Sequence, residues 1–340
     1  MSFDMNTSPT YYEPWPIYCT RFLQKARRMA VSDWVEKCLG FIGYMDGNAF
    51  KPLGTAFLVA YEDEGRGFLY LVTAQHVITE IHQYSDKAAL RMNTEDGVLL
   101  GPIALDQFYF HPNATEYIDV AVTPISIHSP QEPVFVNLTA CAATKERMKE
   151  LSIGPGDEIF VAGQFRYHTG ESRNLPIVRT GNIAGLPDEP IRGKGWSIEG
   201  HLIEVRSLGG LSGSPVFVNM SPIRMFDNKA EYHKGLRHYL LGLIHGHYDE
   251  KDQNLITSAA RLEGVNIGIA VVTPVERILE TMECDELREK RKEILDRLKE
   301  KKNILTEDVS EHESHEKEGD QILETMLNTL PTKQKKVKKD

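Results

Sequence analysis

The stretch that decides the fold reads Gly209-Gly210-Leu211-Ser212-Gly213-Ser214-Pro215-Val216-Phe217-Val218. Its glycines allow backbone conformations that other residues rarely adopt, and the β-forming residues at its end predict a strand directly after a bend. Such a bend turns consecutive amide N–H groups to one side, where they can bind an oxyanion, and it presents the Ser212 hydroxyl. Because glycine- and serine-rich turns before strands are common, this interpretation requires a base and an acid elsewhere in the chain.

The composition narrows the class of protein. The chain has 340 residues, of which 41% are hydrophobic, so it is long enough for two packed lobes. Its 39 basic and 49 acidic residues give a formal charge of -10, whereas a nucleic-acid-binding protein needs a basic face. We find neither a signal-peptide pattern nor an apolar run of bilayer-spanning length. We therefore expect a cytoplasmic protein with no nucleic-acid partner and no membrane partner.

The cysteines argue against a disulfide framework or a zinc site. Cys19, Cys38, Cys141 and Cys284 are scattered along the chain and show no paired spacing. Such cysteines are typical of reduced thiols in a cytoplasmic protein. We expect no cofactor and no bound metal.

Two lobes of short strands are expected, over residues 37–130 and residues 131–272. The runs rich in β-forming residues are 38–44, 54–60, 68–74, 97–100, 103–110 and 120–124, then 134–137, 158–162, 176–184, 202–205, 216–218, 239–244 and 267–272. The polar, glycine-bearing segment 61–67 predicts a hairpin. Many short strands with almost no helix predict an all-β fold of barrels or sandwiches.

The two ends of the chain differ from these lobes. Residues 1–36, with aromatic residues and prolines, predict an extended arm. Residues 273–303 predict a C-terminal helix, with Thr273 as N-cap and Pro274 at the first helical position. Its charged second half is either a single solvated helix or a short coiled coil through which the chain self-associates. Residues 304–340 form a charged tail that we expect to be largely disordered.

Two stretches upstream supply the missing base and acid. His76 ends the β-rich run Leu71-Val72-Thr73-Ala74-Gln75-His76-Val77, and Asp119 opens the apolar run Asp119-Val120-Ala121-Val122. A serine hydroxyl needs a base at hydrogen-bond distance, and histidine titrates near neutral pH. A buried carboxylate holds the imidazole in the required tautomer. We interpret His76, Asp119 and Ser212 as a catalytic triad, with the amides of Gly210 and Ser212 forming the oxyanion hole.

A resemblance to a known family supports this interpretation. Further matching stretches are Gly54-Thr55-Ala56-Phe57-Leu58-Val59, Gly156-Asp157-Glu158-Ile159-Phe160-Val161-Ala162-Gly163 and Gly268-Ile269-Ala270-Val271-Val272-Thr273-Pro274. With the three triad stretches, they resemble the chymotrypsin-like (trypsin-like) serine peptidases, in particular the disulfide-free bacterial HtrA/Deg and V8-like glutamyl endopeptidase branches. The resemblance covers roughly residues 37–282. It implies two perpendicular six-stranded antiparallel barrels with the triad in the cleft between them.

The sequence departs from the family pattern at some positions. Gln75 stands where a small residue is usual, and Leu211 replaces the usual Asn or Asp before the nucleophile. Neither side chain is itself needed for the chemistry. The C-terminal segment is too short and too charged for the PDZ-like module of HtrA proteins.

The resemblance also implies where substrate preference is determined. In this fold the S1 pocket is built from residues about six positions before the nucleophile and from the strand after it, which here gives Arg206 and His245. Together they would form a cationic pocket for Glu, Asp or Gln at P1. Alternatively, Arg206 faces solvent and His245 is an ordinary buried histidine. The pair His245 and His247 has the spacing of metal ligands but lacks an evident third ligand.

These observations predict a serine endopeptidase whose partner is a protein or peptide substrate. Two alternatives stay open: a binding protein with an unproductive peptidase fold, and an effector whose nucleophile turn is repositioned by a partner.

Overall fold

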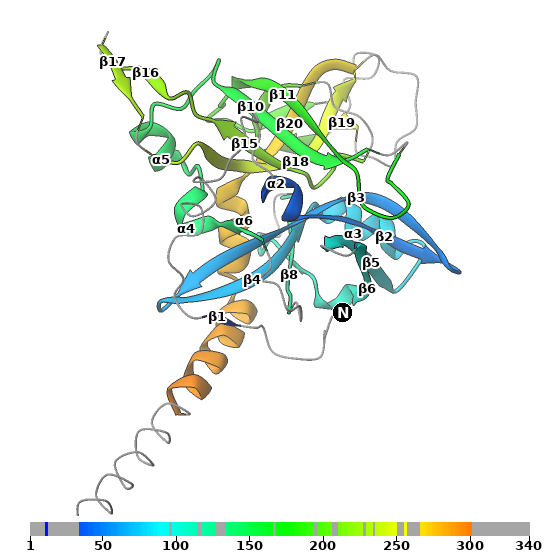
Figure 1. Ribbon diagram of the computed structural model, residues 1–340. Helices are drawn as coiled ribbons and strands as arrows, with labels where there is room; N and C mark the ends of the chain where they lie inside the picture. Colours follow the sequence, from blue (N-terminus) through cyan, green and yellow to red (C-terminus); the bar gives the residue numbers. More distant parts are fainter. Residues whose placement is uncertain are drawn as a thin grey trace, which may run out of the picture. The chain divides into compact units, whose positions relative to one another are not determined.

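A computed structural model describes the central part of the chain (Figure 1). The described residues are 11–12, 34–94, 97–113, 117–126, 134–165, 168–193, 196–205, 210–226, 229–233, 235–249, 255–256 and 266–300. Residues 1–288 form one compact unit and residues 289–340 form another. Most of the predicted arm 1–36 and all of the predicted tail 304–340 lie outside the described residues.

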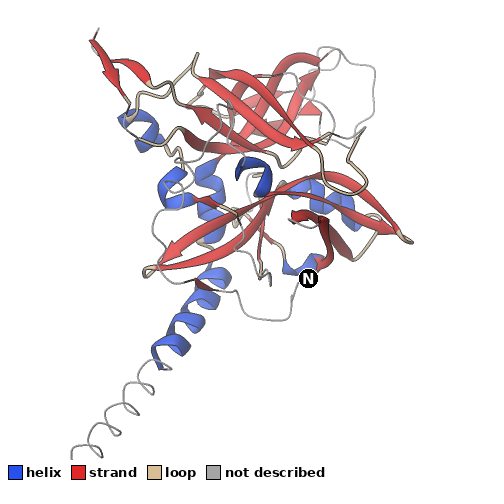
Figure 2. Ribbon diagram, in the orientation of Figure 1, coloured by secondary structure: helices blue, strands red, loops and turns tan. Residues whose placement is uncertain are grey.

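A nine-stranded sheet contains the N-terminal strands (Figure 2). Its main path is β6-β5-β2-β3-β4-β8-β7, with β1 paired to β4 and β9 paired to β3. The strands are β1 (Tyr11–Tyr12), β2 (Leu39–Asp46), β3 (Ala49–Asp63), β4 (Arg66–Thr73), β5 (Lys87–Thr94), β6 (Gly97–Ala104), β7 (Tyr109–Phe110), β8 (Ala121–Pro124) and β9 (Val136–Asn137). The hairpin predicted at 61–67 is confirmed, because β3 and β4 are antiparallel and Glu64 and Gly65 have positive φ.

The described strands of this first sheet do not close into the six-stranded barrel that the sequence predicted. Within the described residues, no ladder joins β6 at one end of the path to β7 at the other. The end strands give a physical reason. β7 has 2 residues and therefore offers few ladder hydrogen bonds. β6 contains Pro102, which has no N–H to donate and is typical of edge strands.

The second β structure is a closed barrel of six strands, as predicted. The ring runs β15-β10-β11-β14-β20-β18 and closes because β18 also pairs with β15. Its strands are β10 (Glu158–Gln164), β11 (Pro176–Gly185), β14 (His201–Glu204), β15 (Pro215–Asn219), β18 (His238–Asp249) and β20 (Asn266–Pro274). The short strand β19 (Leu255–Ile256) pairs antiparallel with the end of β18. Two separate hairpins are β12 (Ile191–Gly193) with β13 (Trp196–Ile198), and β16 (Ile223–Phe226) with β17 (Lys229–Tyr232).

Side chains at alternate strand positions fill the barrel. Ile159 and Val161 of β10 share one buried hydrophobic cluster with Val216 and Val218 of β15, as expected when successive residues point to opposite faces. The cluster lies directly behind the nucleophile turn, because Leu211 belongs to it. The turn thus rests on a packed core.

Several short helices were not predicted. They are α3 (Gln75–His82), α4 (Leu138–Cys141), α5 (Lys145–Glu150) and the 3-10 helix η2 (Leu105–Gln107), whereas α2 (Trp34–Lys37) lies at the end of the N-terminal region 1–36. α3 matters most, because it contains His76, which the sequence placed at the end of a strand. Its buried residues Val77, Ile78 and Ile81 lie on one side of the helix.

The C-terminal helix begins and ends differently from the prediction. α6 (Val275–Met282) has Pro274 as N-cap without a side-chain hydrogen bond, and Thr273 still pairs with Leu243 in the barrel. Thr273 is therefore a strand residue and not the predicted cap. The helix is interrupted after Met282, and residues 285–300 are helical again. α6 contacts β8 of the first sheet and both β18 and β20 of the barrel, so it joins the two structures.

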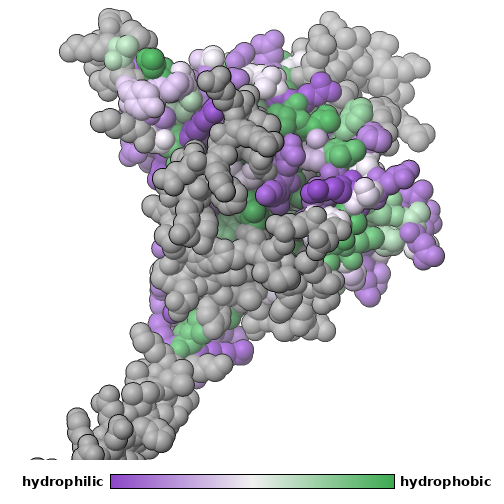
Figure 3. Space-filling view, viewed as in Figure 1, coloured by the Kyte–Doolittle hydropathy of each residue, from purple (hydrophilic) through white to green (hydrophobic). Residues whose placement is uncertain are grey.

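The surface and the thiols add little constraint on function. On the face drawn in Figure 3, hydrophobic residues lie among hydrophilic ones. No described helix is long and apolar enough to cross a bilayer. Cys38, Cys141 and Cys284 are buried and free, and Cys19 lies outside the described residues.

Candidate active site

His76 is the second residue of α3, and its position follows from the helix start. The first amide groups of a helix have no partner inside it, and the N-cap residue Ala74 provides no side-chain bond. Asp119 replaces that cap: the His76 N–H donates to Asp119 Oδ1 at 2.9 Å. The ring Nδ1 of His76 lies 2.7 Å from Asp119 Oδ2. One carboxylate therefore fixes both the backbone and the imidazole of His76.

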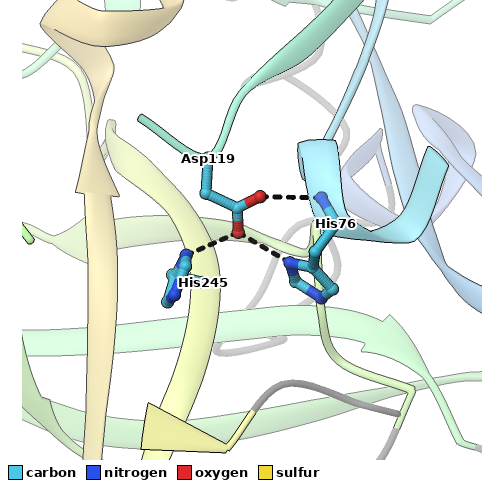
Figure 4. A group of neighbouring side chains, drawn as sticks. All are labelled: His76, Asp119 and His245. Carbon is cyan, nitrogen blue, oxygen red and sulfur yellow. Dashed lines mark hydrogen bonds and ion pairs between the residues drawn. The ribbon is translucent and has the colours of Figure 1, made fainter. Parts of the chain in front are cut away.

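Asp119 is buried and has further partners (Figure 4). Nδ1 of His245 lies 2.5 Å from Asp119 Oδ2, on the side opposite His76. The Tyr117 hydroxyl donates to Asp119 Oδ1 at 3.2 Å. The ring of His245 also lies edge-on to those of His76 and Tyr117, with centroids 5.8 and 6.0 Å away. Each carboxylate oxygen thus has two partners.

These contacts keep Asp119 ionised. Burial alone would raise the pKa of its carboxyl group, but the charges of His76 and His245 and their hydrogen bonds hold the pKa well below its usual range. Burial, together with the same carboxylate, raises the pKa of Tyr117, so this hydroxyl stays a proton donor.

A β-bulge turns His245 toward the site. Along the β18–β20 ladder, Ile244 pairs with Val272 and Gly246 pairs with Val271, which leaves His245 as an extra residue without a partner in this ladder. Bulges bend a strand locally and change the direction of a side chain. The sequence placed His245 in the S1 pocket, and its contact with Asp119 was not foreseen.

The nucleophile turn lies against the start of α3. A Cβ at Gly213 would stand 3.0 Å from the amide nitrogen of Ala74 and 2.5 Å from Thr73 Oγ1. Gly213 has φ +79°, a conformation that favours glycine, so the residue is required for both reasons. The turn therefore packs against the residues that directly precede α3, and its Ser212 is buried.

The amide groups of this turn fall into two sets. Those of Gly213 and Ser214 donate to the carbonyls of Ile244 and Leu211, each at 2.9 Å. Those of Gly210, Leu211 and Ser212 donate no hydrogen bond within the described part of the chain. Gly210 has φ +100°, which again requires glycine. The amides that the sequence assigned to the oxyanion hole, those of Gly210 and Ser212, are thus unpaired among the residues that the structure describes.

The second ring nitrogen of His76 is also unpaired. Nε2 is buried and has no hydrogen-bond partner among the described residues, so a bond to the Ser212 hydroxyl is not formed. Catalytic hydrogen bonds are often long or misaligned without substrate and tighten in the complex. The structure joins His76 to Asp119 directly, and the bond between His76 Nε2 and Ser212 is not formed.

Some of the residues that the sequence assigned to the site are not described by the structure. Arg206 of the predicted S1 pocket lies outside the described residues, as do Gly209 and the side chain of His247. Sequence analysis missed Tyr117 and Thr55, which both contact site residues. Tyr117 stands two positions before Asp119, and Thr55 belongs to a stretch that the family resemblance includes, so their positions were the available signal.

His76, Asp119 and His245 could be considered as metal ligands, since one ligand atom of each lies within 4.8 Å of the others. The Nδ1 atoms are already 2.7 and 2.5 Å from Asp119 Oδ2, which is direct contact. Zinc sits about 2.0–2.2 Å from each nitrogen and oxygen ligand in a tetrahedral site. An ion between these atoms would therefore require the side chains to separate, so the cluster as placed does not fit a metal.

Comparison with known proteins finds similar solved structures, but no family model and no curated protein sequence matches the chain. The fold is similar to the MamO protease domain from Magnetospirillum magneticum, solved in its apo form. The identity is 14% and the TM-score 0.43, over 73% of this chain and 96% of that one. A similarity of this size does not bear on the activity of this chain.

Proposed function

We propose that the protein is a chymotrypsin-like serine endopeptidase whose triad is His76, Asp119 and Ser212. One observation carries the proposal: Asp119 holds the His76 ring by Nδ1, while Nε2 of His76 and the amides of Gly210 and Ser212 have no hydrogen-bond partner among the described residues. A base with one nitrogen fixed and the other available, next to a serine and unpaired N–H donors, is the arrangement that acyl transfer requires.

The reaction follows from these positions. The Ser212 hydroxyl attacks the peptide carbonyl carbon and gives its proton to Nε2 of His76. The amides of Gly210 and Ser212 donate hydrogen bonds to the oxyanion that forms. The imidazolium then protonates the leaving amine, and the acyl-enzyme results. Water, deprotonated by Nε2, hydrolyses the ester and restores Ser212. Asp119 stays ionised throughout and stabilises the imidazolium.

A fluorophosphonate probe tests the proposal, because it reacts covalently with an activated serine. We expect the wild type to be labelled, Ser212→Ala to be unlabelled, and the exposed-site control Ser221→Ala to be labelled at the wild-type rate. Circular dichroism confirms that each variant is folded. Labelling that persists in Ser212→Ala would exclude Ser212 as the nucleophile.

A second candidate is a peptidase-fold protein that is inactive until a partner acts on the turn. The missing bond between His76 Nε2 and Ser212 favours it. The same assay separates the two proposals: a folded wild type that resists the probe alone supports a gated or inactive protein.

We also propose that Arg206 and His245 select Glu, Asp or Gln at P1. With Nδ1 of His245 against Asp119, Nε2 is the ring atom left for a substrate. A positively charged His245 would donate from Nε2 to an acidic P1 side chain, and a neutral one would accept from the amide of Gln. Profiling a peptide library with Arg206→Ala and His245→Ala tests this. An unchanged P1 preference in both variants would rule the pocket out.

A further inference from the structure

Thr55 belongs to β3 of the first sheet, yet it binds the nucleophile turn of the barrel. Its N–H donates to the carbonyl of Ser212 at 2.9 Å, and its Oγ1 donates to the carbonyl of Gly210 at 3.1 Å. The carbonyl of Thr55 accepts from Thr73 Oγ1 at 2.8 Å. Thr55 is fully buried, so water does not substitute for these bonds.

The direction of the side-chain bond is determined by its second partner. The N–H of Gln164 donates to Thr55 Oγ1 at 2.8 Å. The Thr55 hydroxyl accepts there and can direct its own proton to the Gly210 carbonyl, which only accepts. A hydrogen-bond chain thus runs from β10 through Thr55 to the turn. Bonds in such buried chains polarise and strengthen one another.

The close approach depends on glycine at a neighbouring position. A Cβ at Gly163 would come within 2.9 Å of Thr55 Oγ1 and 1.9 Å of Ser214 Oγ. These contacts are shorter than side chains tolerate, so glycine is needed for β10 to reach the hydroxyl. The surroundings of Thr55 are therefore shaped to admit the hydrogen-bond chain.

The bonds to Thr55 orient successive peptide planes. Because a peptide unit is planar, fixing its carbonyl also fixes the N–H of the next residue. The Gly210 carbonyl is held by Thr55 Oγ1, the Leu211 carbonyl by the N–H of Ser214, and the Ser212 carbonyl by the N–H of Thr55. The plane that contains the Gly210 carbonyl is the one held by a side chain, that of Thr55. Gly210 itself has a positive φ.

We infer that Thr55 is a positioning residue that acts from the first sheet through the turn. Its hydroxyl holds the Gly210 carbonyl and thereby fixes the peptide plane between Gly210 and Leu211. This plane lies between the Gly210 N–H and the Ser212 N–H along the backbone, so holding it keeps the directions of these two amides fixed relative to each other. Thr55 contacts no reacting atom. This role rests on the proposed function, since it predicts an effect on the acyl-transfer step.

Two matched pairs of proteins isolate the hydroxyl. Wild type and Thr55→Val have side chains of similar shape, and Thr55→Ser and Thr55→Ala both lack the methyl group. In each pair, the first protein has a hydroxyl that can donate to the Gly210 carbonyl, and the second protein lacks it. Thr281→Val is the control, because Thr281 is a buried threonine whose hydroxyl donates to the carbonyl of Arg277 at 2.6 Å, within α6.

We expect Thr55→Val and Thr55→Ala to lower kcat and the fluorophosphonate labelling rate about 10- to 100-fold, because a displaced donor loses transition-state stabilisation. KM should change little. Thr55→Ser should keep most of the rate of wild type, and Thr281→Val all of it. Equal rates within each pair would overturn the inference.

Hydrogen–deuterium exchange of residues 210–214 supplies a readout that needs no activity. We expect faster exchange in Thr55→Val and Thr55→Ala than in their hydroxyl-bearing partners, and no change in Thr281→Val. If the wild type is not labelled by the probe, the proposed function fails, while the exchange comparison still tests the hydrogen-bond chain. Unchanged exchange in both hydroxyl-free variants would show that the turn does not need Thr55.

Discussion

The two ends of the candidate site differ in how completely their polar atoms are paired. At the acid end, Asp119 has two partners on each oxygen, among them His76, His245 and Tyr117. At the nucleophile end, Nε2 of His76 and the amides of Gly210 and Ser212 are unpaired within the described residues. Buried polar groups are normally satisfied. The contrast indicates that the acid end is built to stay rigid and the nucleophile end to receive a substrate.

The largest effect is expected from Asp119→Asn, which changes the hydrogen bonds at the acid end. An amide presents an N–H group to one of the imidazoles that now donate to the carboxylate, so His76 is held in the wrong tautomer. We expect kcat to fall about 10⁴-fold with the fold retained. Steady-state kinetics and circular dichroism measure both. Asp106→Asn, at an exposed carboxylate, is the control, and an equal loss there would contradict the assignment.

Gly213→Ala should disrupt the nucleophile end by strain. The new Cβ would stand 2.3 Å from the carbonyl oxygen of Thr55, and the residue has φ +79°. Overpacking and the backbone conformation together should lower the free energy of unfolding by about 3–5 kcal/mol. Gly47→Ala is matched, because Gly47 has φ +59° and nothing near its Cβ position. Its cost should be about 1 kcal/mol. Urea denaturation measures both variants. A similar loss of unfolding free energy in Gly213→Ala and Gly47→Ala would show that close packing around Gly213 is not the cause.

Buried histidines without a carboxylate should behave differently from those at the acid end. Burial, with a smaller contribution from Lys145, lowers the pKa of His201 to about 4, and neither ring nitrogen has a hydrogen-bond partner among the described residues. The unfolded chain, with a pKa of about 6.5, binds more protons between these values. Stability is therefore full above pH 6.5 and falls as the pH drops toward 4, by up to about 3 kcal/mol.

Urea unfolding of wild type and His201→Phe between pH 7 and pH 4 checks this expectation. The variant should lose part of the pH dependence, because it removes one titrating group. A pH profile identical to that of wild type would show that His201 is not the group responsible.

The smallest effect is expected from Tyr117→Phe. It removes the 3.2 Å bond to Asp119 Oδ1 and leaves the other partners of the carboxylate in place. A hydrogen bond to a charged group contributes about 1.5–3 kcal/mol, and at 3.2 Å this bond belongs at the lower end, so kcat should fall by about tenfold. The pH–rate profile should keep its shape. A loss as large as that of Asp119→Asn would mean that Tyr117 is essential for holding the carboxylate.

The sequence predicted the parts of the fold and the site that follow local rules. The hairpin at 61–67, most strands of the barrel, and the pairing of His76 with Asp119 were accessible because turn residues, alternation and chemical need are visible in short stretches. The predicted closure of the first barrel is not seen among the described residues, and a sequence gives little sign of closure because it depends on whether distant end strands meet. α3 was missed because Gln75–His82 follows directly on a strand and has no capping side chain.

Contacts made by irregular backbone were the least predictable. His245 reaches Asp119 from a β-bulge, and a regular alternation of residues along β18 gives no sign of the extra residue. Thr55 contacts the turn across the gap between two sheets. Its bond partners Gly210 and Gln164 lie 155 and 109 positions away, which no local pattern reveals.

These long separations also decide when the site is complete during folding. The bond between Thr55 and Gly210 joins residues 155 positions apart in the sequence. Contacts between such distant residues form late in folding, because closing a long loop costs conformational entropy. A chain still emerging from the ribosome, or a folding intermediate with β3 but without the barrel, therefore has no finished nucleophile turn. We expect reactivity toward the probe to appear in the final phase of refolding, so the topology itself delays activity until the chain is folded.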